Sequence, residues 1–259
     1  MNALAIAGFD PSGGGGLARD LATFAAFEVR GFGVVAALTA QNTKEVAAVE
    51  AVGTGLLRRQ LETLLDDMRP SATKVGLLGS SGAVEVVADA AAAGHLGPLV
   101  VDPVLRSTSG DTLAASDLAA VLRDRLLPQT ALLTPNLDEA AALTGEAVQD
   151  EAAMERAGKR LCELGAGAVL VKGGHLAGDP VDLLVTENGA ERFSSPRIAV
   201  PAVRGTGCAL SSAITAGLAR GWPLRRAVED ARGWLRRALE AAGPVGEGAW
   251  LLGDVPPAM

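Results

Sequence analysis

Glycine and cysteine residues stand together in the segment 204–212 (RGTGCALSS), at the start of an uncharged run that reaches Ala219. Glycines directly before a helix leave several backbone N–H groups unpaired and pointing toward one place. Together with the helix dipole, these groups form a site for an anion such as a transferring phosphoryl group. Cys208 lies at the predicted helix N-terminus, where its pKa is expected to lie below the ~8.5 of a free thiol. The segment predicts a phosphate site with a reactive thiol, and a buried, inert cysteine is the alternative.

A lysine ends the apolar run 168–172 and opens the segment 172–175 (KGGH). An ammonium group at the end of a buried strand, beside two glycines, is suited to bind phosphate as a mobile point charge. A solvent-exposed Lys172 before a turn is the competing interpretation, and the sequence leaves both open. His175, taken alone, favours a structural role.

Carboxylates follow two further apolar runs. Asp102 ends the run 99–102 and precedes a proline, a common position for a Mg²⁺-associated group. After the run 131–134, Asn136 and Glu139 have the spacing of a capping box, which stabilises a helix start by about 0.5–2 kcal/mol. The spacing supports capping and a metal-linked function equally, and the two are compatible.

Four consecutive glycines, residues 13–16, follow the first apolar run. They allow the backbone to approach a ligand closely, although the Gly-Lys-Ser/Thr of a P-loop is missing. A flexible turn is the alternative interpretation. Gln41 follows the second apolar run, and its amide can accept and donate hydrogen bonds at the edge of a ring. An ordinary polar loop residue is the alternative there.

Short apolar runs alternate with amphipathic segments along the chain, and this alternation predicts the elements that position these residues. The expected strands are 4–7, 33–38, 72–78, 99–102, 131–134, 168–172, 182–186 and 192–195. Helical spacing of apolar residues covers 57–68 and 224–239. The arginines of 224–239 are predicted to form a solvated face, and a phosphate-binding patch is the alternative.

Strands that alternate with helices imply right-handed crossovers and an α/β fold. We therefore expect a three-layer α/β/α architecture, with helices on both faces of a mostly parallel central sheet. No linker of domain size interrupts the pattern, so residues 1–259 are predicted to form one domain. Ligands of such sheets bind at the carboxyl ends of the strands, which is where the polar residues above stand.

The composition excludes several classes of protein. There are 23 Lys and Arg against 30 Asp and Glu, a net charge of −7, and no Tyr, which argues against nucleic-acid binding. The longest uncharged stretch, 205–219, is too short to span a membrane, and the N-terminus lacks the basic region of a signal peptide. Two cysteines fit a reducing cytoplasm, and no zinc-ligand cluster of the usual spacing is present.

The ordered motifs at 8–24, 102–104, 136–139, 172–175 and 205–212 resemble the hydroxymethylpyrimidine/phosphomethylpyrimidine kinases of thiamine biosynthesis, which are ribokinase-like enzymes. The resemblance covers about residues 3–240. It implies ATP-dependent phosphorylation of 4-amino-5-hydroxymethyl-2-methylpyrimidine and then of its monophosphate, with ATP and Mg²⁺. It also implies a homodimer and small-molecule substrates, without a nucleic-acid or membrane partner.

The resemblance further implies a role for each matched residue. The pyrimidine pocket would be lined by Gly15, Asp20, Gln41, Leu77 and Val104, with Gln41 facing the ring. ATP would be bound by Asn136, Lys172 and Thr206, and Mg²⁺ by Asp102 and Glu139 through water. The catalytic residues would be Lys172, the anion hole of Gly205 and Gly207, and Cys208, which replaces the usual catalytic aspartate of ribokinase-like enzymes.

Four positions depart from the family pattern: Phe9, Val203-Arg204 in place of Thr-His, Thr108 in place of Lys, and the tail 246–250. These departures indicate a lower efficiency of the second phosphorylation. Arg204, however, would restore a positive charge near the phosphates. Three other functions are compatible with parts of the sequence. These are a pyridoxal or pyridoxamine kinase, an acyl-transfer enzyme with Cys208 as nucleophile, and a pyrimidine-binding homologue without catalysis.

Overall fold

Alternating strands and helices build one mixed sheet in the computed structural model, which describes residues 1–105 and 118–256. Across the sheet, the nine strands of these residues are β3 (Val46–Ala51), β2 (Arg30–Gln41), β1 (Asn2–Phe9), β4 (Ala72–Val75), β5 (Leu99–Val101), β6 (Leu132–Leu133), β7 (Val169–Lys172), β8 (Val181–Thr186) and β9 (Gly189–Ser194). Neighbours from β2 to β7 are parallel. The edge strands β3 and β9 and the strand β8 are antiparallel to their neighbours.

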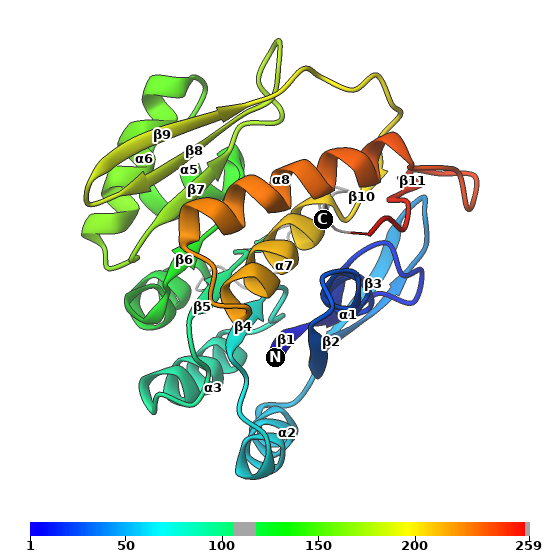
Figure 1. Ribbon diagram of the computed structural model, residues 1–259. Helices are drawn as coiled ribbons and strands as arrows, with labels where there is room; N and C mark the ends of the chain where they lie inside the picture. Colours follow the sequence, from blue (N-terminus) through cyan, green and yellow to red (C-terminus); the bar gives the residue numbers. More distant parts are fainter. Residues whose placement is uncertain (106–117, 257–259) are drawn as a thin grey trace.

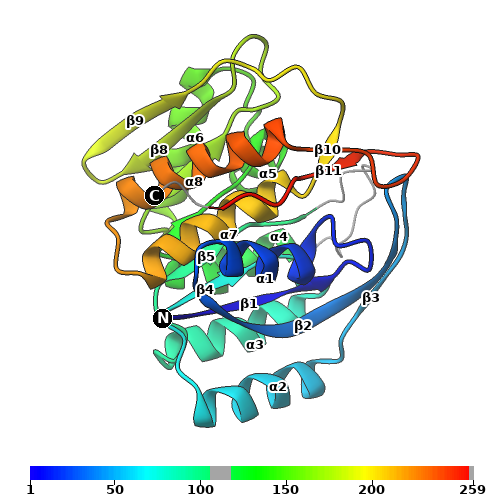
Figure 2. The ribbon, with the colours of Figure 1, turned by 45° about the vertical axis from the view of Figure 1, so that its right-hand side comes forward.

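Helices cover both faces of this sheet (Figures 1 and 2). One face carries α1 (Gly16–Ala26), α7 (Thr206–Ala219) and α8 (Leu224–Glu240). The other carries α2 (Thr54–Asp67), α3 (Ser81–Ala92), α4 (Leu118–Val121), the π-helical stretch η1 (Leu122–Leu126), the 3₁₀ turn η2 (Leu127–Gln129), α5 (Leu137–Thr144) and α6 (Glu151–Glu163). The predicted three-layer, mostly parallel α/β/α architecture is confirmed. None of these helices combines the length and apolar character needed to cross a bilayer.

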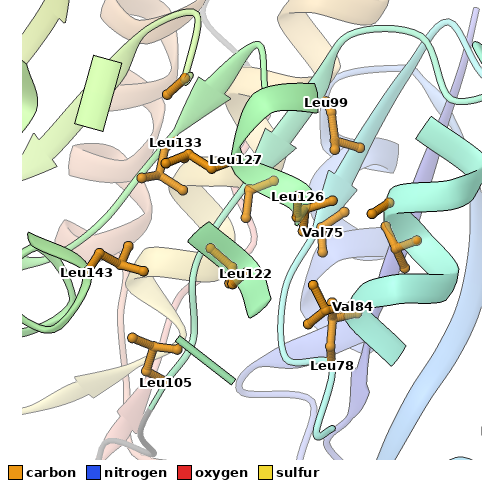
Figure 3. Close-up of a cluster of buried hydrophobic side chains, with 14 of the residues drawn as sticks. Val75, Leu78, Val84, Leu99, Leu105, Leu122, Leu126, Leu127, Leu133 and Leu143 are labelled. Carbon is orange, nitrogen blue, oxygen red and sulfur yellow. The ribbon is translucent and has the colours of Figure 1, made fainter. Parts of the chain in front are cut away.

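Side chains of the central strands alternate between two hydrophobic cores. In β1, Leu4 and Ile6 pack with α2 and α3, whereas Ala3, Ala5 and Ala7 pack with α1 and α7. Figure 3 shows part of the first core, where leucines of η1 and η2 meet Val75, Leu99 and Leu133 of the strands. Burial on both faces explains why the strands read as continuous apolar runs.

A short parallel pair stands apart from the main sheet, formed by β10 (Val203–Arg204) and β11 (Trp250–Leu251). It leads directly into α7. The chain after α8 also reaches the β2–β3 turn, where the Ala249 N–H donates to Thr43 O at 2.9 Å. The C-terminal segment thereby fixes both the start of α7 and the end of β2, two parts of the chain that lie far apart in sequence.

Several predicted boundaries were wrong. Of the predicted strand 72–78, only Ala72–Val75 forms a strand (β4), because the chain leaves the sheet after Val75. The strand β3 was not predicted, because its exposed alanines lack a clear apolar alternation and its pairing with β2 defines it. The short strands β10 and β11 were likewise missed, because two residues carry no periodicity.

Candidate active site

A cleft of about 860 Å³ opens at the carboxyl ends of the parallel strands and below the N-terminus of α7. It brings together nearly all residues singled out in the sequence. Those that line it are Gly15, Gln41, Leu77, Asp102, Val104, Asn136, Glu139, Lys172, Gly205, Thr206, Gly207 and Cys208. Of the predicted set, Asp20 alone does not line it.

The start of α7 forms an amide cradle at the edge of this cleft. Gly205 is the N-cap and adopts a left-handed conformation, with φ +78° and no side-chain cap. The first helical hydrogen bond runs from the Ala209 N–H to Gly205 O at 2.8 Å, so the three amides of residues 206–208 precede the intrahelical ladder. Since residues 206–208 all line the cleft, these amides and the helix dipole suit an anion there.

Replacing Gly205 with alanine is expected to disrupt the cradle. A Cβ atom at this position would lie 1.7 Å from Gly14 O, and the left-handed backbone is unfavourable for alanine. We expect a destabilisation of about 1–3 kcal/mol and at least a tenfold loss of turnover. Thermal unfolding and steady-state kinetics measure both. Gly233→Ala is the control, because a Cβ at Gly233 in α8 would meet only the Arg237 side chain, at 3.9 Å. Unchanged stability and turnover in Gly205→Ala would contradict the cradle.

Lys172 and Asp102 form an ion pair beside the cradle. Lys172 Nζ lies 2.7 Å from Asp102 Oδ1, and the side chains are 15% and 4% exposed. A Cβ at Gly207 would lie 3.2 Å from Lys172 Nζ, so the glycine lets the lysine approach the helix start. Burial opposes the charged form of Lys172, but Asp102 and Glu139 raise its pKa above the ordinary value. Lys172 is therefore a fixed cation in the cleft.

Asn136 and Glu139 form the predicted capping box of α5. Asn136 Oδ1 accepts from the Glu139 N–H, and Glu139 Oε2 accepts from the Asn136 N–H, both at 2.8 Å. Both residues also line the cleft, so capping and access to a ligand coexist. Burial raises the pKa of Glu139 to about 7, with Lys172 opposing and Asp102 adding to the shift.

The carboxylates of Asp102 and Glu139 fit a magnesium ion that keeps most of its waters. No group of three or more histidine, cysteine or acidic side chains in 1–105 and 118–256 forms a metal cage. Magnesium bound with substrate phosphates needs only one or two protein carboxylates. Asp102 and Glu139 are the residues that would hold such an ion through water.

The predicted low pKa of Cys208 is wrong. Its thiol lies against the Gly16 N–H and near Lys74 and Asp20. Burial raises the pKa of Cys208 to about 11, because desolvation and the two nearby carboxylates outweigh Lys74 and the amide. The thiol is thus protonated at neutral pH. A protonated thiol is a poor nucleophile, which argues against Cys208 as the nucleophile of an acyl transfer.

Asp20, predicted to line the pyrimidine pocket, lies behind it. Both carboxylate oxygens accept from Lys74 Nζ, at 2.8 and 3.0 Å, and Ser212 Oγ donates at 2.7 Å. Asp20 and Lys74 are fully buried. Burial raises the pKa of Asp20, while Lys74 opposes that shift. The pair joins α1, β4 and α7 beneath the cradle, so Asp20 is a structural residue and the prediction of its position was wrong.

Asp10 is a cleft residue that the sequence reasoning missed. Its Oδ2 accepts from Gln41 Nε2 at 3.0 Å and from the Gly15 N–H at 2.9 Å. Its Oδ1 accepts from the Ser12 N–H at 2.8 Å, which is an Asx turn. An aspartate followed by Pro-Ser-Gly is a signal for such a turn and could have revealed it. Asp10 holds the glycine turn and orients Gln41.

The family departures have different surroundings. Phe9 is 41% exposed and does not line the cleft. Arg204 does line it and is buried. The tail glycines Gly246 and Gly248 pack against Thr43. Thr108 lies outside the described residues.

The arginines of α8 have two different kinds of surroundings. Arg225 and Arg226 are exposed, as predicted, and pair with acidic residues one turn along the helix. Arg232 and Arg236 instead line the cleft, and Arg232 pairs with Asp182. The predicted solvated face is therefore wrong at Arg232, whose side chain is 14% exposed and paired with Asp182 of β8.

The same architecture occurs in solved structures of kinases, and this similarity places the chain in the class of ribokinase-like kinases. An ADP complex of pyridoxal kinase from Bacillus subtilis has a TM-score of 0.90, with 31% identity, over 98% of this chain and 97% of that one. A phosphomethylpyrimidine kinase from Clostridium difficile has a TM-score of 0.82 and 36% identity, over 92% and 99%. The predicted ribokinase-like fold is confirmed.

Sequence comparison narrows this class to one family. A family model described as phosphomethylpyrimidine kinase matches residues 10–252. The hydroxymethylpyrimidine/phosphomethylpyrimidine kinase of Escherichia coli is 42% identical, over 93% of this chain and 92% of the relative. The chain belongs to the phosphomethylpyrimidine kinase family.

Proposed function

We propose that the protein transfers the γ-phosphoryl group of ATP to the hydroxymethyl group of 4-amino-5-hydroxymethyl-2-methylpyrimidine, and then phosphorylates the monophosphate to the pyrophosphate, in thiamine biosynthesis. The supporting observation is one cleft that holds the amide cradle of residues 206–208, the Lys172–Asp102 pair and Gln41. The family and the activity named for its relatives support the same reaction.

The pyrimidine occupies the part of the cleft beside the glycine turn. Gly15 leaves room for the ring, and Leu77 and Val104 supply apolar contacts. Gln41 reads the edge of the ring with its amide, in the orientation that Asp10 imposes. Asp10 is therefore a positioning residue for Gln41.

The nucleotide phosphates occupy the part of the cleft between α5 and α7. Lys172 and Asn136 contact them, and the Thr206 amide adds a donor at the helix start. Asp102 and Glu139 would hold Mg²⁺ through water, and the ion would supply positive charge that neutralises the phosphates. The ion pair with Lys172 holds the Asp102 carboxylate in place, and the capping box of α5 holds that of Glu139.

Catalysis rests on positioning and on preorganised charge. Phosphoryl transfer develops charge on the transferring group, and donors already in place stabilise it without rearrangement. Lys172 and the amides that follow Gly205 supply this stabilisation. Because its thiol is protonated, Cys208 orients the acceptor hydroxyl and does not remove its proton at neutral pH.

Replacing Cys208 with alanine is expected to slow the first phosphorylation by about tenfold and the second by much less. The second acceptor is already a phosphate oxyanion, which needs no thiol to orient a hydroxyl. With the pKa of Cys208 near 11, the ratio of wild-type to variant rates is expected to be constant between pH 7 and 9. Equal losses in both steps, or a tenfold rise of the ratio per pH unit, would exclude this role.

Phosphate transfer from ATP to three acceptors tests the proposal: the pyrimidine alcohol, its monophosphate and pyridoxal. We expect turnover of the first two and a higher kcat/KM for the alcohol than for pyridoxal. Pyridoxal is included because of the structural similarity to a pyridoxal kinase. A preference for pyridoxal would assign the protein to that activity, and ligand binding without turnover would leave a pyrimidine-binding homologue.

We further propose that the chain acts as one kinase domain, as a homodimer in the cytoplasm. One sheet carries all the site residues, which supports a single domain. Phe9 and Leu38 are neighbours on β1 and β2, are 41% and 52% exposed, and offer apolar area to a second copy. Sedimentation equilibrium is expected to give twice the chain mass.

A further inference from the structure

Arg204 is a buried cation without a counter-charge among the described residues. It is 7% exposed, and its Nη1 atom is buried with no hydrogen-bond partner. No ion pair of the described chain includes it, in contrast to Lys172 and Arg232 in the same cleft. Burial of an unpaired charge is costly. Such a residue is expected where a ligand supplies the missing negative charge.

Its position connects it to the amide cradle. Arg204 lines the cleft and directly precedes Gly205, the N-cap of α7. In β10 it pairs with Leu251, and both Leu251 and Gly205 pack against Gly14. Arg204 therefore lies on the side of the cradle that faces the glycine turn, whereas Lys172 lies at Gly207. The helix start and an unpaired buried arginine point independently to an anion.

The charges in the cleft indicate which anion this is. Lys172 is already paired with Asp102, whereas no ion pair within 1–105 and 118–256 includes Arg204, and its Nη1 has no hydrogen-bond partner there. In the first transfer the acceptor is a neutral alcohol. In the second it carries a phosphate monoester of about −1.5 to −2 charges, on the side of the glycine turn. An arginine binds such a group with two parallel hydrogen bonds.

We propose that Arg204 binds the phosphate group of the monophosphate acceptor and thereby raises the affinity of the cleft for the second substrate. This inference rests on the proposed function, which supplies a phosphorylated acceptor. It assigns a positioning and specificity role to a position at which this chain departs from the family pattern.

Kinetics of Arg204→Gln test the assignment. The KM of the monophosphate is expected to rise about 10- to 100-fold, as for the loss of charge-assisted hydrogen bonds, while the KM of the alcohol and of ATP change less than threefold. Arg204→Lys keeps the charge but not the paired donors, and an intermediate KM is expected. Arg226→Gln is the control, because Arg226 lies on the exposed face of α8. A larger rise for ATP than for the monophosphate, or equal changes for both acceptors, would overturn the inference.

A binding experiment separates this inference from the proposed function. Calorimetric titration of the monophosphate into the ATP-free protein measures its Kd. The Kd of Arg204→Gln is expected to be about 10- to 100-fold higher than that of the wild type, like the rise expected for its KM. The melting temperature of Arg204→Gln is expected to equal or exceed that of the wild type, because an unpaired buried charge is removed. A lower melting temperature with unchanged affinity would show a purely structural arginine and overturn the inference. If the wild type phosphorylates neither acceptor, the proposed function fails, and the titration still decides whether Arg204 binds phosphate.

Discussion

Replacing Lys172 with methionine is expected to lower kcat for transfer to the pyrimidine alcohol by about 10²- to 10³-fold. Lys172 Nζ is held 2.7 Å from Asp102 Oδ1, beside Gly207 in the first turn of α7. A cation fixed there stabilises the charge that develops on the transferring phosphoryl group, and methionine of similar length removes it. Steady-state turnover with ATP and the alcohol measures the loss.

Two further variants make this result specific. Lys159→Met removes a lysine from the exposed face of α6, where it pairs with Glu155, and is expected to leave kcat within twofold. Lys172→Arg keeps the charge with a different geometry, and an intermediate rate is expected. If Lys172→Met retained more than a tenth of the wild-type kcat, the lysine would not be part of the catalytic group.

Replacing Lys74 with methionine is expected to lower the free energy of unfolding by about 3–5 kcal/mol. The lysine and Asp20 are both fully buried, and their 2.8 Å contact joins β4 to α1, with Ser212 of α7 as a third member. Without Lys74, the Asp20 carboxylate remains buried with no positive partner. Urea unfolding measures the change, and Arg58→Met, which breaks an exposed pair with Asp89, is expected to cost less than about 1 kcal/mol.

The loss in Lys74→Met is expected to depend on pH. Burial already raises the pKa of Asp20 above its ordinary value of 3.8, and without Lys74 the pKa rises further. The folded variant then binds a proton that the unfolded chain releases, so its stability falls as pH rises from about 4. The variant is therefore closest to the wild type in acid. Asp20→Asn in the same chain is expected to recover part of the loss, and a deficit independent of pH would argue against a buried charge as its cause.

The main elements of the fold were readable from local patterns. Continuous apolar runs predicted the central strands because both faces of a parallel sheet are buried, and helical spacing predicted α2 and α8. The edge strand β3 and the pair β10–β11 were not predicted. Their side chains carry little periodicity, so pairing with distant segments defines them.

The composition of the site was also largely readable. Glycines before a helix, a lysine at a strand end and carboxylates after strands each have a local chemical meaning, and parallel strands end at one edge. The capping box of Asn136 and Glu139 is likewise a local feature, and the structure contains it. Such local features can be predicted from the sequence because the groups that interact in them lie within a few residues of each other.

Side-chain surroundings were decided only by the tertiary structure. The sequence by itself determined a three-layer α/β chain with an anion site at a helix start. Folding decided that Asp20 turns inward to Lys74 and that burial raises the pKa of Cys208. It also buried Arg204 Nη1 without a hydrogen-bond partner among the residues that the structure describes. Desolvation and charge pairing depend on which groups share a space, and here those groups come from segments far apart along the chain.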